Sequence, residues 1–168
     1  MKYEVIDNFL DEKYFDNLVT FFTDRGGTEK KILPWYFVSA IAKENVIENN
    51  LFYMVHPLYD DNVPMSSLFN NLIPLLDKLE ARCLLRIKVN LYPNTEKLHE
   101  HPMHKDYPFS HSAAILSLNT CDGYTKLKDG TKIESVANRI LLFDASGEHC
   151  STTTTNVSAR INININYF

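Results

Sequence analysis

Cysteine is scarce in this sequence, which contains only Cys83, Cys121 and Cys150. The number is odd and no CxxC spacing occurs, so the pattern indicates neither a disulfide framework nor a thiolate zinc site. Free cysteines are typical of proteins kept in a reducing compartment. We therefore expect a cytoplasmic protein.

Long apolar runs are also missing. No segment reaches the roughly 18 uninterrupted apolar residues that a transmembrane helix requires. Acidic residues interrupt the first apolar stretch, MKYEVIDNFLDEKYF, which a signal peptide would not tolerate. We expect neither export nor association with a membrane.

A strongly basic charge is the third feature that the sequence lacks. The formal net charge is -4, with 7 basic and 13 acidic side chains in residues 1–80 and 10 basic and 8 acidic in residues 81–168. This balance argues against extended nucleic-acid binding through phosphates, whereas the mildly positive second half suits a small anionic ligand. With 168 residues and 45% hydrophobic content, we expect one domain covering 1–168.

The hydrophobic period changes along the chain. Residues 11–22 and 66–79 have apolar side chains at helical spacing, and short strands are expected at 3–9, 35–41 and 51–56. From Leu84 onward the chain consists of short β-rich stretches separated by turn residues: LLRIKVNLYPN, SAAILSLNT, GYTKLKDGTKIES, NRILLFDA and SARINININYF. The pattern predicts an α+β, mainly β fold, in which residues 1–83 supply helical support and flanking strands and residues 84–168 form the β core.

The last predicted strand alternates strictly. Ile161, Ile163, Ile165 and Tyr167 share one face, because successive side chains of a strand point to opposite sides. The other face holds Arg160, Asn162, Asn164 and Asn166. This polar face suits either an exposed surface or the lining of a polar cavity, and the alternation does not decide between them.

Four of the 6 histidines lie in the segment LHEHPMHKDYPFSH. Its HxD triplet, His104-x-Asp106, is near chance level in a chain with 6 histidines and 11 aspartates. It gains meaning together with His149, because two imidazoles and one carboxylate from separate β segments form the facial triad of non-haem Fe(II) oxygenases. The i, i+2 spacing places His104 and Asp106 on one side of a strand.

Arg160 follows His149 after a threonine-rich stretch. If STTTTN is the turn between the last two strands, His149 and Arg160 are about equally far from its midpoint and become cross-strand neighbours. An arginine there is well placed to bind the distal carboxylate of a ligand that chelates the metal.

These residues resemble the Fe(II)- and 2-oxoglutarate-dependent oxygenases. The similarity also covers PWYF, RIKVNLYPN, SLNTCDGYTKLKDG, NRILLFD and RINININYF, so it spans almost the whole chain and looks like a compact subgroup common in bacteriophage and marine bacterial sequences. The resemblance implies a double-stranded β-helix (jelly-roll) with the metal in its mouth. It also implies the cytoplasm of a bacterium or of a phage-infected host.

The resemblance implies a role for each matching residue. His104, Asp106 and His149 would bind Fe(II), and Arg160 would pair with the C5 carboxylate of 2-oxoglutarate. Asn90 and Tyr92 resemble an Asn-x-Tyr element of the nucleic-acid dealkylating branch, in which both side chains contact the co-substrate. That branch has a second arginine where this chain has Asn166, and collagen-type prolyl hydroxylases usually have lysine in place of the first, so membership of neither subgroup follows.

The implied reaction consumes O2 and 2-oxoglutarate. Oxidative decarboxylation yields succinate and CO2, and hydroxylation of the substrate is the usual outcome; ascorbate is a possible reductant for the iron. The protein supplies orientation and electrostatics, while the iron and the co-substrate supply the difficult chemistry.

Other interpretations of the histidines stay open. His99 and His101, with Asp106 and His149, approximate the metal motif of a cupin-like enzyme that does not use 2-oxoglutarate, and a non-catalytic module that retains the fold is a third hypothesis. Otherwise we expect His99 and His101 at the pocket rim, His111 in a loop or at a strand edge, and His56 on the surface. The substrate ranking is a peptide residue, then a small molecule, then a nucleobase.

Overall fold

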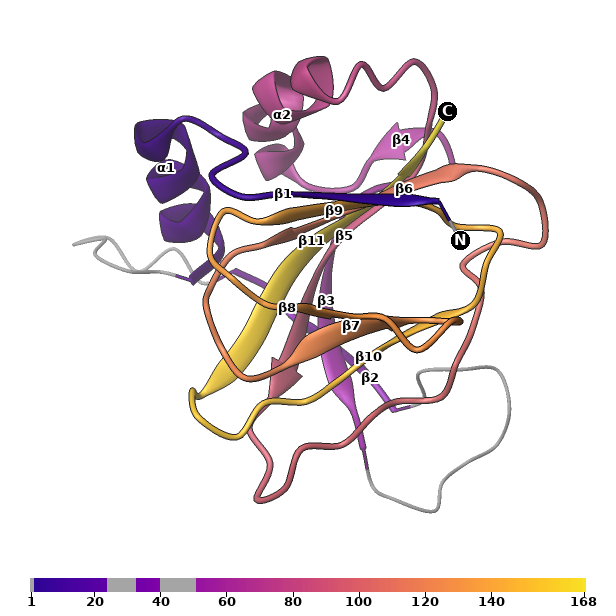
Figure 1. Cartoon of the computed structure of the whole chain (residues 1–168). Coiled ribbons are helices and arrows are strands. Elements are labelled where there is room, and N and C mark those ends of the chain that lie inside the picture. The colour runs from indigo at the N-terminus through magenta and orange to yellow at the C-terminus, as the bar shows by residue number, and fades with distance from the viewer. Residues whose placement is uncertain (1, 24–32, 40–50) are drawn as a thin grey trace.

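The computed structural model describes residues 2–23, 33–39 and 51–168, and it is dominated by antiparallel strands (Figure 1). The large sheet has, in spatial order, β1 (Tyr3–Ile6), β9 (Ile140–Asp144), β6 (Ser112–Ser117), β11 (Ala159–Tyr167), β5 (Leu84–Pro93), β3 (Tyr53–Asp60) and β2 (Tyr36–Val38), and β4 (Val63–Pro64) pairs with β3. A small sheet has the order β10 (His149–Ser151), β7 (Tyr124–Leu127) and β8 (Lys132–Glu134).

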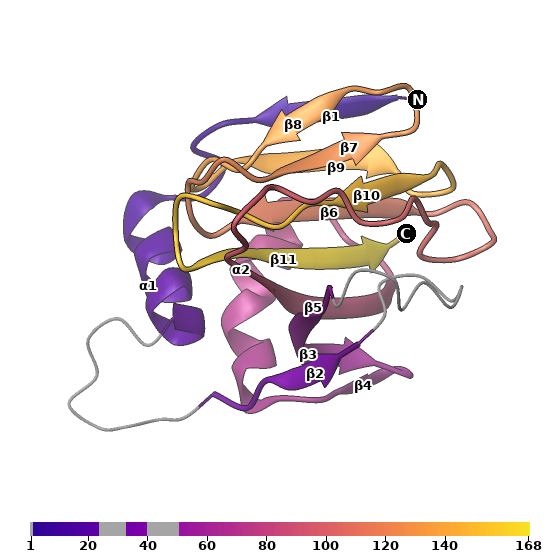
Figure 2. The ribbon, with the colours of Figure 1, turned by 90° about the horizontal axis from the view of Figure 1, so that it is seen from below.

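Two helical segments cover one side of the large sheet, and the small sheet lies on its other side (Figures 1 and 2). The helical segments are α1 (Glu12–Thr23) and a 3₁₀ turn, η2 (Ser67–Leu72), which continues directly into α2 (Ile73–Lys78). This confirms the predicted α+β, mainly β architecture. The helices predicted at 11–22 and 66–79 are both present, although the first half of the second is 3₁₀.

The larger hydrophobic core lies between the helices and the large sheet. Apolar side chains of α1 point inward at helical spacing, and Phe15, Leu18 and Phe22 are buried. They belong to the same buried cluster as Ile163 and Ile165 of β11. The isoleucine face of β11 is therefore the outer, helix-covered face of the sheet.

A second, smaller core fills part of the space between the two sheets. It joins β6 and β9 to β7 and β8 through Ile115, Phe143, Leu127 and Ile133. The opposite face of β11 points into this space, and Arg160, Asn162, Asn164 and Asn166 are all at most 5% exposed. The polar face of the last strand thus lines the interior. Of the two possibilities that the sequence left open, an exposed surface and the lining of a polar cavity, the second is correct.

Segments outside the named strands complete the region between the sheets. Glu100 pairs with Thr152, and His104 pairs with His149, each as an isolated β-bridge.

The predicted strand at 35–41 corresponds to β2, and the last two residues of the prediction, 40 and 41, lie outside the described residues. Among the residues described, no helix has the length and apolar character needed to cross a membrane.

Candidate metal and co-substrate site

A polar pocket of about 750 Å³ opens between the two sheets. β5 contributes every second side chain to its wall, and β11 contributes Asn162 and Asn164. The rest of the wall comes from the segment 102–108, from β10 with the preceding Glu148, and from Tyr53 of β3 and Ile115 of β6. The residues that β5 places on the wall are Arg86, Lys88, Asn90 and Tyr92.

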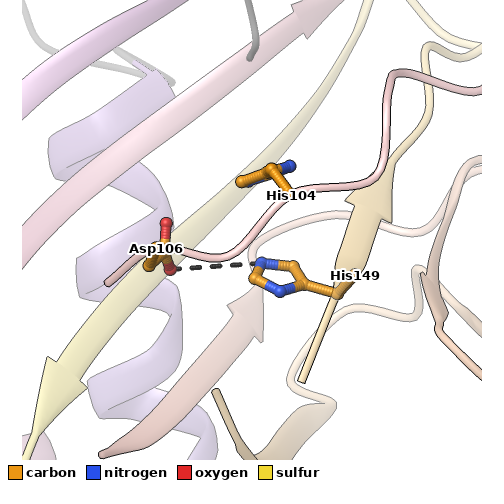
Figure 3. Close-up of side chains that lie close together, drawn as sticks. All are labelled: His104, Asp106 and His149. Atoms are coloured by element: carbon orange, nitrogen blue, oxygen red, sulfur yellow. Dashed lines mark ion pairs between the residues drawn. The ribbon is translucent and has the colours of Figure 1, made fainter. Parts of the chain in front are cut away.

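His104, Asp106 and His149 lie close together on this pocket (Figure 3). Their candidate ligand atoms all lie within 4.8 Å of one another, and His149 Nε2 is 4.0 Å from Asp106 Oδ2. Backbone hydrogen bonds of 2.9 and 3.0 Å join His104 and His149 directly. The structure thus brings together the three residues that the sequence singled out as a facial triad.

The protonation states in this group suit a divalent metal. Burial lowers the pKa of His149 to about 4, even though Asp106 nearby acts to raise it. The imidazole is therefore neutral at physiological pH, as a metal ligand must be. His104 Nδ1 lies 3.2 Å from the Pro102 carbonyl oxygen, which leaves Nε2 available for a metal.

Asp106 is held ionised by its neighbours. Arg86 donates a hydrogen bond of 2.8 Å to Oδ1, and Asn164 Nδ2 lies 3.5 Å from Oδ2. Burial acts to raise the pKa of this carboxyl group, but nearby positive charges, that of Lys88 foremost, lower it to about 2. One carboxylate oxygen is thus engaged by the arginine, while the other faces the histidines, as a monodentate ligand requires.

Arg160 is buried without an acidic partner among the described residues. Its guanidinium donates hydrogen bonds only to neutral oxygens, those of Ser135, Thr125 and the Thr152 backbone, at 3.1, 2.9 and 3.4 Å. The side chain is 1% exposed, and burial lowers its pKa. A buried guanidinium without a counter-charge is costly, so this arrangement favours an anionic ligand.

Tyr92 lies between Arg160 and the pocket. The guanidinium carbon is 5.4 Å from the centroid of the Tyr92 ring, and Tyr92 lines the pocket whereas Arg160 does not. Ser151 donates a 3.0 Å hydrogen bond to the phenol oxygen, and burial raises the pKa of this phenol to about 12. A ligand carboxylate would therefore reach Arg160 only if the Tyr92 side chain moved aside.

Asn90 is tied to β11. Its amide donates a 3.0 Å hydrogen bond to Asn162 Oδ1, opposite which it lies in the sheet. Its own Oδ1 is buried and has no hydrogen-bond partner among the described residues. Asn90 therefore lines the pocket with an unused acceptor.

The predicted pairing of His149 with Arg160 is wrong. β10 pairs with β7, so His149 lies opposite Leu127, whereas β11 pairs with β5 and β6, and Arg160 lies opposite Tyr92. The threonine-rich stretch is a crossing between sheets rather than a hairpin turn. Asp122 holds it through hydrogen bonds from the hydroxyl groups of Thr154 and Thr155.

Comparisons place this geometry among known folds. No family model matches the sequence, and no curated protein matches it. An oxidoreductase of the 2OG-Fe(II) oxygenase family from Burkholderia pseudomallei superposes with a TM-score of 0.68 over 98% of this chain and 84% of its own, at 13% identity. This chain has the 2OG-Fe(II) oxygenase fold.

Two further structures share this oxygenase fold. A prolyl hydroxylase from Trichoplax adhaerens, solved with a hypoxia inducible factor peptide fragment, gives a TM-score of 0.59 at 17% identity, over 99% of this chain and 83% of that chain. The α-ketoglutarate-dependent epimerase SnoN of nogalamycin biosynthesis gives 0.66 at 13% identity, over 99% and 78%. The predicted jelly-roll is therefore confirmed, and at these identities the likeness concerns the fold.

The other four histidines of this chain do not belong to the metal group. We expected His56 on the surface and His101 at the pocket rim, and both expectations are wrong. Both side chains are 3% exposed. His56 bridges the Pro34 carbonyl oxygen and the Ser66 hydroxyl, both at 2.9 Å, and packs against the Trp35 ring. His111 directly precedes β6, as expected of a strand-edge residue, but it is also buried, at 4% exposed.

His101 and His99 do not join the metal group that the structure forms. The His101 ring packs against Tyr92 at a centroid distance of 5.3 Å, and both of its nitrogens are buried without a partner among the described residues. The cupin-like ligand set is thus not brought together.

Two pocket cations, Arg86 and Lys88, were not singled out from the sequence. The signal was present, because RIKVNLY places Arg86 and Lys88 at two-residue spacing from Asn90 and Tyr92, on the same face of the strand. A polar face on a strand that precedes the HxD triplet could have identified them.

Proposed function

We propose that this protein is an Fe(II)- and 2-oxoglutarate-dependent dioxygenase that hydroxylates a peptide side chain or a small molecule. The observation that carries the proposal is the His104, Asp106 and His149 group on a pocket together with a buried arginine, Arg160, which lies behind the pocket residue Tyr92 and lacks an acidic partner among the described residues. A metal triad alone suits many hydrolases and oxygenases, but the additional guanidinium suits a chelating ligand with a second carboxylate.

The donor set fits Fe(II). The neutral imidazole of His149, the imidazole of His104 and the ionised carboxylate of Asp106 would hold the metal, and all three line the polar pocket. Bound Fe(II) with 2-oxoglutarate and O2 would supply the oxidative chemistry, releasing succinate and CO2. The role of the protein is to keep Asp106 ionised through the nearby charges of Lys88 and Arg86, and to keep His149 neutral by burial.

The remaining residues position the co-substrate. Arg160 would pair with its C5 carboxylate once the Tyr92 ring moves aside, and the phenol of Tyr92 is a neutral hydrogen-bond donor at physiological pH. Asn90 and Asn162 present amide groups to the same pocket. Together these groups provide one fixed charge and several neutral contacts, which suits orientation of a dicarboxylate.

The decisive experiment is anaerobic titration of the purified chain with Fe(II) and 2-oxoglutarate. We expect the visible charge-transfer band of a 2-oxo acid chelated to Fe(II), followed by succinate formation when O2 is admitted. His104→Ala should remove both signals. His99→Ala is the matched control, because His99 is in the same segment but outside the metal group, and it should retain them.

Two results would reject the assignment. The wild-type chain could give neither the band nor succinate, which would favour a non-catalytic module that retains the fold. Alternatively His99→Ala could abolish metal binding while His104→Ala preserves it, which would favour a cupin-like ligand set.

A further inference from the structure

Lys88 places a positive charge inside the pocket, beside the metal group. It lies on β5 between Arg86 and Asn90 on the wall-forming face. Its neighbour across the sheet is Asn164, which in turn reaches Asp106. The side-chain nitrogen lies 5.7 Å from the centroid of the Tyr53 ring, another pocket residue, so the ammonium group faces the cavity.

No acidic group among the described residues pairs with Lys88. Asp106, the nearest candidate, has Oδ1 engaged by Arg86 at 2.8 Å and Oδ2 facing His149. Glu148 also lines the pocket, but it pairs with the exposed Lys128 at 3.2 Å. The ammonium group has neither a hydrogen bond nor an ion pair within the described part of the chain.

This lack of a partner has an energetic cost. Lys88 is half-buried, and desolvation, reinforced by the charge of Arg86, lowers its pKa to about 8 although Asp106 and Asp60 act to raise it, so the environment disfavours the charged form. An apolar residue would fill the same space without this penalty. A lysine is explained if an anion enters the pocket and compensates the charge.

The charge balance of the loaded pocket points the same way, and this step rests on the proposed function. Asp106 and the two carboxylates of 2-oxoglutarate would be balanced by Fe(II) and Arg160. Arg86, Lys88 and Lys105 then remain as excess positive charge on the pocket wall. Arg86 is oriented toward Asp106 and Lys105 is exposed to solvent, so Lys88 is the available cation within the pocket.

We propose that Lys88 binds an anionic group, a carboxylate or a phosphate, on the substrate that is oxidised. The pocket of about 750 Å³ is of the size that holds small molecules. A lysine ammonium is a compact point charge that accepts either anion without the planar geometry that arginine imposes. The substrate class is therefore a small anionic molecule.

The test measures binding to the chain loaded with Mn(II), as a stable substitute for Fe(II), and saturating 2-oxoglutarate. Phenyl phosphate, benzoate and the neutral benzamide are titrated calorimetrically into the wild type, Lys88→Met and Lys88→Arg. Lys97→Met is the matched control, since it removes an exposed lysine outside the pocket lining. The two anions separate a phosphate from a carboxylate preference.

For the wild type we expect phenyl phosphate or benzoate to bind at least about tenfold more tightly than benzamide. Lys88→Met should abolish this preference, while Lys88→Arg and Lys97→Met should retain it. Equal binding of all three probes to the wild type, or an unchanged preference in Lys88→Met, would overturn the proposal.

A separate measurement distinguishes this proposal from the proposed function. If Lys88→Met weakens 2-oxoglutarate itself more than about tenfold, Lys88 serves the co-substrate and the present proposal is wrong, while the dioxygenase assignment stands. If the wild type binds neither Mn(II) nor 2-oxoglutarate, the dioxygenase assignment fails. The anion preference of the unloaded chain then decides the role of Lys88.

Discussion

Gly123 packs directly against Arg160, and replacing it with alanine should disturb the buried guanidinium. A Cβ atom at position 123 would lie 2.7 Å from Arg160 Cδ and 2.7 Å from the Thr153 carbonyl oxygen. The first contact is with a side chain that is fully buried, and the second is with backbone, so neither can move freely. We expect Arg160 to shift away from the hydroxyl groups that now hold it.

The magnitude follows from overpacking in a buried site. Inserting one methyl group against fixed atoms costs about 1–3 kcal/mol of unfolding free energy. A hydrogen bond between the Arg160 guanidinium and the carboxylate of 2-oxoglutarate contributes about 1.5–3 kcal/mol, so displacing Arg160 should weaken 2-oxoglutarate binding roughly tenfold to a hundredfold. Urea unfolding and calorimetric titration of 2-oxoglutarate with Mn(II) measure the two effects.

Gly130→Ala is the matched control. Gly130 has a φ of +88°, and a Cβ atom added there would meet no other atom within 4 Å, so alanine is strained by its backbone and not by contacts. It should destabilise the chain by about 1–2 kcal/mol while leaving 2-oxoglutarate affinity unchanged. If Gly123→Ala binds 2-oxoglutarate as tightly as Gly130→Ala does, Arg160 does not hold the co-substrate.

Two further predictions concern the surroundings of the metal group. Arg86→Met removes the 2.8 Å contact to Asp106 Oδ1 and should weaken Mn(II) binding about 10–100-fold in a direct titration; undiminished affinity would show that Arg86 does not orient the ligand. Burial lowers the pKa of His101 to about 4, below its unfolded value near 6.5, so the unfolded chain binds more protons and stability should fall as the pH drops from about 6.5 to 4. Urea unfolding at pH 7 and pH 4 measures this loss of unfolding free energy, and His101→Phe should reduce it by up to about 3 kcal/mol. An unchanged pH dependence in His101→Phe would contradict the burial of His101 as a neutral ring.

The sequence predicted the β core well because its strands alternate. In β11 the period of two determined which residues share a face, but it is symmetric and did not say which face is inside. That choice depended on the apolar face of α1, where Phe15, Leu18 and Phe22 need a partner surface. The isoleucines supply it, so the arginine and asparagines are turned toward the pocket.

The connection between β10 and β11 could not be predicted in the same way. Equal spacing around STTTTN suits a hairpin, but spacing does not tell whether two successive strands belong to one sheet. Asp122 decides it, since its carboxylate accepts hydrogen bonds from Thr154 and Thr155 and holds this stretch as a crossing. Asp122 is far from that stretch in the sequence, so the residue pattern around STTTTN does not predict this contact.

The buried histidines reveal a second limit of local patterns. His111 looked like a loop residue, yet its Nε2 lies 3.1 Å from Asn166 Oδ1, and Asn166 donates to Asn164, which reaches Asp106. The polar face of β11 thus forms a hydrogen-bonded chain that ends at the metal group. Isolated polar residues at these positions would be costly, whereas linked ones satisfy one another.

The hydrogen-bonded asparagines of β11 are neutral, and the cations of the site lie at separate positions around them. Asn166 donates to Asn164, and Asn164 reaches Asp106, so these two residues of β11 add hydrogen bonds to the site without adding charge. Three cations lie at or behind the pocket: Arg160 lies near the start of β11 behind Tyr92, Arg86 lies beside Asp106, and Lys88 lies opposite Asn164. Two of these three cations have assigned roles in the proposed reaction. The third, Lys88, has no hydrogen bond or ion pair among the described residues, and the proposed substrate anion would supply one.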